Sequence, residues 1–240
     1  MLRIWGRISS INVQKVVWCA GELGCEFERI DAGGSFGVVD TPAYGRLNPN
    51  RKVPVIEDDG FVLWESNAIV RYLCARYAGA LSLGRPGGGA TKAPLALRAV
   101  PPSGSAPSCG RPGGGLMPAS LAARAECDRW MDWQATEFSP MLRDAFLQLI
   151  RTPPQQRQPA LVEESVRRCE PLLAILDEAL ADRAFLVGDG FTMADIPIGC
   201  TVHRWLALPI ERIARPNVDK WFERVRNRAA AQAVLALPLS

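Results

Sequence analysis

The chain has 240 residues, of which 28 are Lys or Arg and 25 are Asp or Glu, giving a formal net charge of +3. This length can bury a sizeable core and suffices for one large or two small domains. No apolar run approaches the ~18 to 20 residues of a membrane span, and Arg3 and Arg7 interrupt any signal-peptide core, so we expect a cytoplasmic protein. The basic excess lies in residues 79–120, and residues 1–78 and 121–240 are close to neutral, which argues against nucleic-acid binding.

The cysteine and histidine content speaks against a disulfide framework and a metal site. The seven cysteines are odd in number and scattered, with no Cys-x-x-Cys pair. This pattern fits buried or idle thiols in a reducing compartment. His203 is the only histidine, so it cannot belong to a His-rich metal cluster. We therefore expect no metal and a structural role for His203.

The first 46 residues predict a β-α-β unit. Residues 2–5 read as a strand, and apolar residues at helical spacing between 13 and 23 indicate an amphipathic helix that Gly24 closes. Residues 25–30 read as a second strand, which a right-handed crossover would make parallel to the first. Residues 31–46 are looser and hold at most a short helix.

Residues 51–77 predict a hairpin followed directly by a helix. The β-rich runs 53–56 and 61–64 flank Asp58-Asp59-Gly60, which offers the residues a tight hairpin needs at positive φ. After Trp64 the apolar residues recur at helical spacing, so we expect a helix over 65–77. The whole N-terminal order is then βαβ, a connection, and ββα.

Two features of this hairpin and helix suit a ligand. Pro54 has no N–H to give to a sheet ladder, which leaves the backbone of Val53 free to pair with something else. Glu65 and Ser66 present a carboxylate, a hydroxyl and free N–H groups, which together fit an α-amino acid headgroup. Taken singly, each feature also has an ordinary structural explanation. Proline is common at the start of an edge strand, and Glu65-Ser66 can simply cap a helix. Their fixed order favours a binding site.

In that order the residues resemble the glutathione-binding half of the cytosolic glutathione S-transferases. The resemblance implies a thioredoxin-like α/β N-terminal domain followed by an all-α C-terminal bundle, with a cis proline at Pro54. It also implies that Val53 pairs with the cysteinyl unit of glutathione, and that Glu65 and Ser66 hold its γ-glutamyl end. Lys52 would meet the glycyl carboxylate, although a lone basic residue can equally be a solvated surface charge.

The resemblance is to bacterial, serine-type, theta-like members of this family, and it implies that Ser9 is the catalytic hydroxyl. Ser9 falls where the first strand ends and the first helix begins. A hydroxyl there, beside a helix N-terminus, can stabilise a thiolate; protein thiols at helix N-termini fall from about 8.5 to between roughly 3.5 and 7.5 in pKa. Ser10 and Asn12 are the reserve positions and further candidate contacts to glutathione. A plain N-cap is the alternative for either serine.

Other catalytic types of the family lack their residue here. No Cys stands between Arg7 and Asn12, so a glutaredoxin-like mixed disulfide has no nucleophile, and no Tyr stands there for a tyrosine-type enzyme.

Residues 79–120 depart from the family pattern. They are rich in Gly, Pro, Ser and Ala, and Gly-Arg-Pro-Gly-Gly-Gly occurs in them twice, so we predict a mobile linker or insert, either a genuine elaboration or a shifted reading frame.

The remainder, residues 121–240, predicts helices only. One helix covers 121–150, a second runs to about residue 182, and shorter ones cover 202–206 and 218–226. Thr192 and Asp195 form a predicted capping box with a folding role. We therefore expect three segments, a glutathione-binding domain (1–78), the insert (79–120) and an α-helical domain (121–240).

The predicted function is conjugation of glutathione thiolate to a small apolar electrophile, without a metal. The family further implies a detoxifying, cytoplasmic homodimer. Fold alone does not decide function, so two alternatives stay open. One is a protein of the same fold that binds without turnover, and the other is a glutathione-dependent dehalogenase or reductase.

Overall fold

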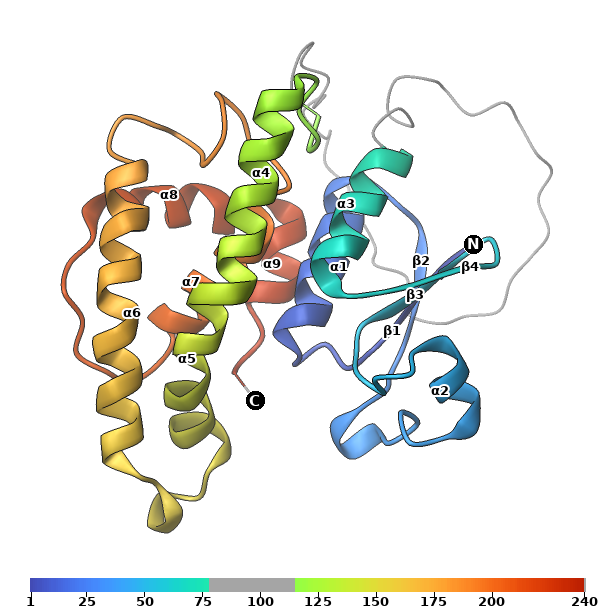
Figure 1. Ribbon diagram of the computed structural model, residues 1–240, viewed down its shortest axis with the longest axis horizontal. Helices are drawn as coiled ribbons and strands as arrows, with labels where there is room; N and C mark the ends of the chain where they lie inside the picture. Colours follow the sequence, from blue (N-terminus) through green and yellow to red (C-terminus); the bar gives the residue numbers. More distant parts are fainter. Residues whose placement is uncertain (78–114, 240) are drawn as a thin grey trace.

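The computed structural model describes residues 1–77 and 115–239, and within them the chain forms two domains packed side by side (Figure 1). The N-terminal domain is a small sheet with helices on both faces, and the C-terminal domain is helical. None of the helices in these ranges is long and apolar enough to span a membrane. The prediction of a linker over 79–120 falls almost wholly outside the described residues, so the three predicted segment boundaries remain predictions.

The N-terminal domain has the predicted order of elements. They are β1 (Leu2–Trp5), α1 (Ile11–Glu22), β2 (Phe27–Ile30), η1 (Gly34–Phe36), α2 (Pro42–Leu47), β3 (Val55–Asp58), β4 (Phe61–Trp64) and α3 (Ser66–Tyr77). The sheet order is β2-β1-β3-β4, with β1 parallel to β2 and the other pairs antiparallel. Helices α1 and α3 cover one face and α2 covers the other (Figure 1). This is the thioredoxin-like arrangement, as predicted.

Turn chemistry explains where these elements begin and end. Asp59 and Gly60 both have positive φ, 50° and 88°, so the β3–β4 connection is the two-residue turn that matches the twist of a hairpin. Residues 31–46 contain two short helical segments, η1 and α2, where we expected at most one. Thr41 caps α2 by accepting the Tyr44 N–H at 3.2 Å, and Pro42 stands in its first turn.

The C-terminal domain is built from one long interrupted helix and several shorter ones. They are α4 (Leu121–Trp133), η2 (Gln134–Phe138), α5 (Ser139–Phe146), η3 (Leu147–Arg151), η4 (Pro154–Gln156), α6 (Pro159–Ala179), α7 (Asp195–Leu206), α8 (Pro216–Arg226) and α9 (Ala229–Leu235). The predicted helix over 121–150 is continuous in direction, but η2 and η3 are π-helical turns. Pro140 lies just after η2, and its missing N–H and its ring disturb the preceding turn. Helix α9 was not predicted.

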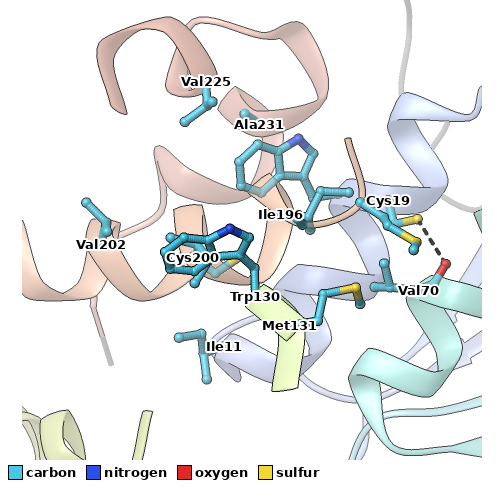
Figure 2. Close-up of a cluster of buried hydrophobic side chains, with 14 of the residues drawn as sticks. Ile11, Cys19, Val70, Trp130, Met131, Ile196, Cys200, Val202, Val225 and Ala231 are labelled. Carbon is cyan, nitrogen blue, oxygen red and sulfur yellow. Dashed lines mark hydrogen bonds between the residues drawn. The ribbon is translucent and has the colours of Figure 1, made fainter. Parts of the chain in front are cut away.

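One large hydrophobic cluster runs through both domains (Figure 2), and a smaller one that includes Tyr44 of α2 belongs to the N-terminal domain. The large cluster includes Cys19 of α1, Val70 of α3, Met131 of α4 and Ile196 of α7, all fully buried. The predicted core position of Cys19 is confirmed, and its thiol lies 3.6 Å from that of Cys74. The two domains are therefore one packing unit.

Helices α7 and α1 approach each other closely at Gly199 on α7. A Cβ at this position would lie 2.8 Å from the ring of Trp18 on α1, well inside normal contact. Trp18 is itself completely buried. The absence of a side chain at Gly199 thus lets α7 lie directly on α1.

The predicted capping box at the start of α7 is present and forms a buried polar centre. The Asp195 carboxylate is fully buried and accepts hydrogen bonds from the N–H of Thr192 at 2.8 Å and of Leu186 at 3.1 Å. It also accepts the indole N–H of Trp221 on α8 at 2.8 Å. One side chain therefore joins the loop before α7, the helix itself and α8, which is a folding role.

Replacing Asp195 with Ala should destabilise the protein by about 3 to 5 kcal/mol, because three buried donors would lose their charged acceptor. Urea unfolding followed by tryptophan fluorescence measures this. The matched control is Asp189→Ala, an exposed carboxylate in the same loop, which should change stability by less than about 0.5 kcal/mol. Equal effects of the two changes would refute the role of Asp195.

Candidate functional site

Several predicted site residues lie at the N-termini of two helices that pack against each other. Helix α1 begins at Ile11 and helix α3 at Ser66. The Ser66 hydroxyl donates a hydrogen bond to Oδ1 of Asn12 at 3.3 Å, which joins the first turns of both helices. Each N-terminus carries unpaired N–H groups and a positive partial charge. Together they create a region suited to a negatively charged ligand.

Ser9 and Ser10 occupy the turn that leads from β1 into α1. Both are partly exposed, and the Ser10 N–H donates to the Arg7 carbonyl at 3.1 Å. Ser10 stands at the N-cap position of α1, but its side chain accepts no capping hydrogen bond. Neither hydroxyl is bonded to any residue in the described ranges, so neither makes the side-chain capping bond that the N-cap alternative would give it. Both hydroxyls can serve a ligand.

Val53 lies beside the loop that follows β1. The Val53–Pro54 bond is cis, as the family resemblance implied. A Cβ built at Gly6 would lie 3.0 Å from Cβ of Val53, so this valine sits close to the strand end that leads to Ser9. The register of β3 with β1 begins at Val55. Val53 is therefore outside the ladder that β3 forms with β1.

Lys52 and Glu65, the residues that precede Val53 and Ser66, are both exposed to solvent. Lys52 is exposed, and its carbonyl is held by the Tyr44 hydroxyl at 2.9 Å and the Asn48 amide at 2.8 Å. Glu65 is exposed and has a φ of 72°, a left-handed conformation that costs a residue with a side chain about 1 to 2 kcal/mol. Ser66 is only 6% exposed. Strain of this kind is commonly found at functional sites.

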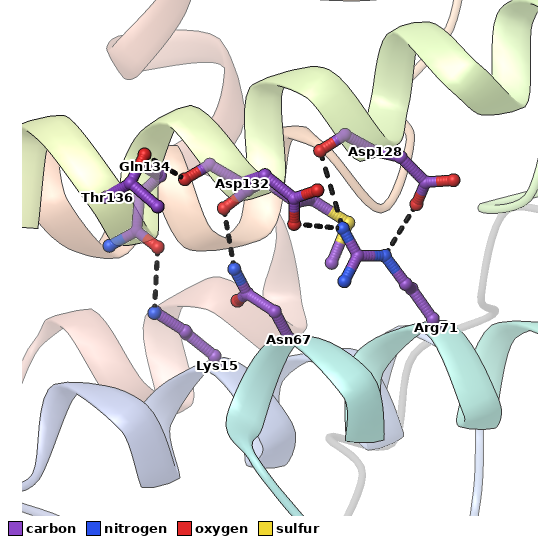
Figure 3. A network of polar contacts seen from close by, with 8 residues as sticks. Lys15, Asn67, Arg71, Asp128, Asp132, Gln134 and Thr136 are labelled. Carbon is purple, nitrogen blue, oxygen red and sulfur yellow. Dashed lines mark hydrogen bonds and ion pairs between the residues drawn. The ribbon is translucent and has the colours of Figure 1, made fainter.

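A polar network that we did not predict fixes α3 against α4 (Figure 3). The Arg71 guanidinium forms ion pairs with Asp128 and Asp132, each at 2.5 Å. Asn67 donates from its amide to the Met131 carbonyl at 2.6 Å. Because Asn67 directly follows Ser66, this hydrogen bond also fixes the start of α3. The helical domain thereby positions one side of the candidate site.

Lys15 is a buried cation in the contact between α1 and the helical domain. It is 2% exposed, and its ammonium donates to Oε1 of Gln134 at 2.9 Å (Figure 3). Gln134 in turn donates to the Thr201 hydroxyl at 2.8 Å. Burial lowers the pKa of Lys15 from its ordinary 10.5 to about 8. A sequence signal was available, since Lys15 stands four residues from the buried Ile11 and Cys19 on the apolar face of α1.

The described ranges contain no group of three or more His, Cys, Asp or Glu side chains placed to hold a metal ion. His203 lies on α7, partly buried and stacked against Phe222, and burial lowers its pKa. It lies on a different helix from those whose N-termini carry Ser9 and Ser66. We assign it to packing.

The sheet, the paired helix N-termini and the attached bundle define a thioredoxin-like domain joined to a helical domain. Residues 1–75 match the family model of the glutathione S-transferase N-terminal domain, and residues 138–229 match that of the C-terminal domain. The chain is 33% identical to glutathione S-transferase GstB of Escherichia coli K12 over 100% of both chains. It is 28% identical to glutathione S-transferase 3 of Zea mays, over 99% of this chain and 95% of the other.

A solved structure agrees with these similarities. The theta class glutathione S-transferase of Xanthomonas axonopodis pv. citri, solved with glutathione bound, superposes with a TM-score of 0.82 at 39% identity, covering 100% of this chain and 99% of that one. The chain belongs to the glutathione S-transferase family. It is accordingly a transferase enzyme with the fold that the sequence predicted.

The burial of Lys15 has a measurable pH signature. The unfolded chain binds more protons than the folded one between pH 8 and 10.5, so the cost of burying Lys15 is full below pH 8 and is relieved as the pH rises. The stability of the wild type relative to Lys15→Met should therefore increase by up to about 3 kcal/mol across that window.

Urea unfolding of both proteins at about pH 7, 8, 9 and 10 gives the free energy of unfolding of each at every pH. Taking the difference between the two proteins cancels the tyrosines and cysteines that titrate in the same range. The control is Lys220→Met, at an exposed lysine on α8. The difference in free energy of unfolding between the wild type and this variant should not change with pH. If the difference for Lys15→Met is also independent of pH, the lowered pKa assigned to Lys15 is wrong.

Proposed function

We propose that the protein conjugates the thiolate of glutathione to a small, largely apolar electrophile. The observation that carries this proposal is the hydrogen bond between Asn12 and Ser66, which brings the starts of α1 and α3 together next to Val53. The relative from Xanthomonas axonopodis pv. citri was solved with glutathione bound, and it aligns over the whole of this chain.

Each part of the tripeptide then has a chemically suitable partner. Ser66 and Glu65 receive the γ-glutamyl group, because a hydroxyl, free N–H groups and a carboxylate match its carboxylate and ammonium. The backbone of Val53, outside the sheet ladder, pairs with the cysteinyl unit. Lys52 is exposed and can meet the glycyl carboxylate. Asn12 and Ser10 complete the contacts.

Ser9 is the residue that we assign to the chemistry. Its hydroxyl donates a hydrogen bond to the glutathione sulfur, and the N-terminus of α1 adds a favourable partial charge. Both effects stabilise the thiolate and lower the pKa of the thiol, so more of the nucleophile is present at neutral pH. The thiolate then attacks the electrophile, and the leaving group departs with its bonding electrons.

Two other readings of the same site are separated by experiment. A non-catalytic glutathione-binding protein would bind but show no turnover, and a dehalogenase or reductase would yield a different product from a halogenated substrate. We favour conjugation because the turn after β1 has hydroxyls and no cysteine, so a mixed disulfide with glutathione has no partner there. A cytoplasmic, detoxifying homodimer, and the segment boundaries near residues 78 and 120, are parts of the same proposal.

Ser9→Ala should lower kcat for an aryl halide about 10- to 150-fold, the equivalent of one hydrogen bond to a charged group. The affinity for glutathione should change little, because the other contacts remain. The pKa of bound glutathione, measured from thiolate ultraviolet absorbance, should rise by about 1 to 2 units. This pKa readout separates a role at the sulfur from a structural one.

The control for Ser9 is Ser10→Ala, at the neighbouring position in the same turn. We expect it to leave the thiol pKa nearly unchanged. If Ser10→Ala raises the pKa and Ser9→Ala does not, the catalytic assignment to Ser9 is wrong.

Ser66→Ala should weaken glutathione binding about 10-fold or more, because a hydrogen bond to the γ-glutamyl carboxylate is lost. Isothermal titration calorimetry with glutathione measures the change. The matched control is Ser165→Ala on α6, where a serine 4% exposed donates to the Met141 carbonyl. The control should lower stability and leave the affinity for glutathione unchanged. Wild-type affinity of Ser66→Ala for glutathione would count against the proposed contact with the γ-glutamyl group.

A further inference from the structure

Arg7 opens the turn that carries Ser9. The Arg7 carbonyl accepts the Ser10 N–H at 3.1 Å, and the Arg7 N–H donates to the Ala32 carbonyl at 3.0 Å. The first of these hydrogen bonds closes a β-turn over residues 7–10, in which Ser9 is a central residue. The second ties the turn to the loop that follows β2. The turn that holds the candidate catalytic hydroxyl is therefore anchored at Arg7.

The Arg7 side chain lies against two glycines of the loop after β2. A Cβ built at Gly33 would lie 3.0 Å from Nη1 of Arg7, and one at Gly34 would lie 3.1 Å from its Nε. A side chain at either position would therefore displace the guanidinium. Both glycines have a positive φ, 79° and 62°, which glycine adopts without steric cost. This stretch of bare backbone fixes where the guanidinium lies.

The same loop places the guanidinium beside Val53. The Cβ position of Gly33, which is 3.0 Å from Nη1 of Arg7, is 3.4 Å from Cγ1 of Val53. The Cβ position of Gly6, the residue before Arg7, is 3.0 Å from Cβ of Val53. Val53 is thus in contact with the backbone on both sides of the guanidinium. Arg7, the turn with Ser9, and Val53 meet where β1 ends and β3 is about to begin.

Arg7 has no counter-ion in the part of the chain that the structure describes. Within those residues its guanidinium forms no side-chain hydrogen bond and no ion pair. The carboxylate of Asp31, which lies just before the two glycines, is already paired with Arg29. Arg7 is only partly exposed, so water solvates its charge incompletely. A partly desolvated cation favours an anion placed beside it.

Other charged groups surround the proposed glutathione position. Lys52 and Glu65 are exposed, and we have assigned them to the two ends of the tripeptide. On the side of the helical domain, burial and to a lesser extent the charge of Arg7 lower the pKa of Arg151 in η3. Arg151 therefore adds a like charge and does not neutralise Arg7. Arg7 is the cation that shares a turn with Ser9.

We propose that Arg7 stabilises the glutathione thiolate through its charge, as a second group besides Ser9. The proposal rests on the transferase function described above, because Ser9 and Val53 define where the sulfur lies. With the sulfur bonded to the Ser9 hydroxyl and the cysteinyl backbone paired with Val53, the sulfur lies between the turn and the cis peptide bond. The guanidinium is adjacent to that position. A neighbouring cation favours the ionised thiol and lowers its pKa.

Ionisation of the thiol leaves Arg7 chemically unchanged. The S–H bond breaks, the bonding pair stays on sulfur, and the proton passes to water. A guanidinium is already protonated at neutral pH, so it cannot accept this proton and acts by its charge alone. The Ser9 hydroxyl contributes a directional hydrogen bond, whereas Arg7 contributes a field that acts over several ångströms. Substitutions can therefore separate the two effects.

The pKa of bound glutathione, measured from thiolate ultraviolet absorbance, tests the role of Arg7. Arg7→Met should raise this pKa by about 1 unit or more, and Arg7→Lys should raise it less because Lys keeps the charge. The matched control is Arg3→Met, which removes an exposed arginine from β1 and should leave the pKa unchanged. For Arg7→Met, kcat/KM should fall about 10-fold at about pH 6.5 and less at about pH 9, where most of the thiol is ionised in both proteins.

Binding of S-methylglutathione separates a charge effect on sulfur from other roles of Arg7. This thioether cannot ionise, so calorimetry should give nearly the same affinity for the wild type and Arg7→Met. If Arg7 instead bound a carboxylate of the tripeptide, the affinity for the thioether would fall while the thiol pKa stayed the same. That result, or an unchanged thiol pKa in Arg7→Met, overturns the proposal. If Arg7→Met does not fold, Arg7→Gln removes the charge and must show the same rise in pKa.

The outcomes also distinguish this proposal from the one on which it rests. A raised thiol pKa in Ser9→Ala, without a rise in the variants that remove the Arg7 charge, overturns the role of Arg7 alone. A wild type that fails to bind glutathione, or fails to conjugate it to an aryl halide, overturns the transferase function and the role of Arg7 together. A raised thiol pKa in Arg7→Met with unchanged binding of the thioether supports both.

Discussion

Helix α1 is held from two sides, and the candidate site depends on this constraint. Its inner face packs on the sheet and α3, and its outer face meets α7 where Gly199 allows contact with Trp18. Ser9 and Ser10 stand at its N-terminus, and Asn12 in its first turn bonds to Ser66. Since interiors are densely packed and barely compressible, small shifts of α1 are resisted from both domains. The hydroxyls at its start thereby acquire a fixed position relative to Val53.

Local sequence signals were reliable where one or two residues decide the backbone. The Asp59-Gly60 turn and the capping box of Asp195 followed from such signals. The π-helical turns next to Pro140 were missed because a helical pattern of apolar residues does not show how hydrogen bonds readjust around a proline. Helix α9 was missed since its Ala-rich sequence has no capping residue.

Site residues were predicted unevenly for a similar reason. Ser9, Val53 and Ser66 could be proposed because they follow a short ordered pattern within the first 66 residues. The ion pairs of Arg71 with Asp128 and Asp132 join residues from separate helices, and nothing near these residues in the chain indicates them. Contacts between distant segments had to be seen in three dimensions.

The core that crosses the domain boundary has a consequence for how this enzyme can evolve and be engineered. Although two separate family models match residues 1–75 and 138–229, Cys19, Val70, Met131 and Ile196 pack as one cluster. A thioredoxin-like half expressed by itself would expose the apolar side of α1 and α3 to water, at a free-energy cost that a small domain can hardly sustain. Exchanging helical domains between relatives in order to change substrate preference therefore requires the exposed faces of α1 and α3 to be exchanged as well.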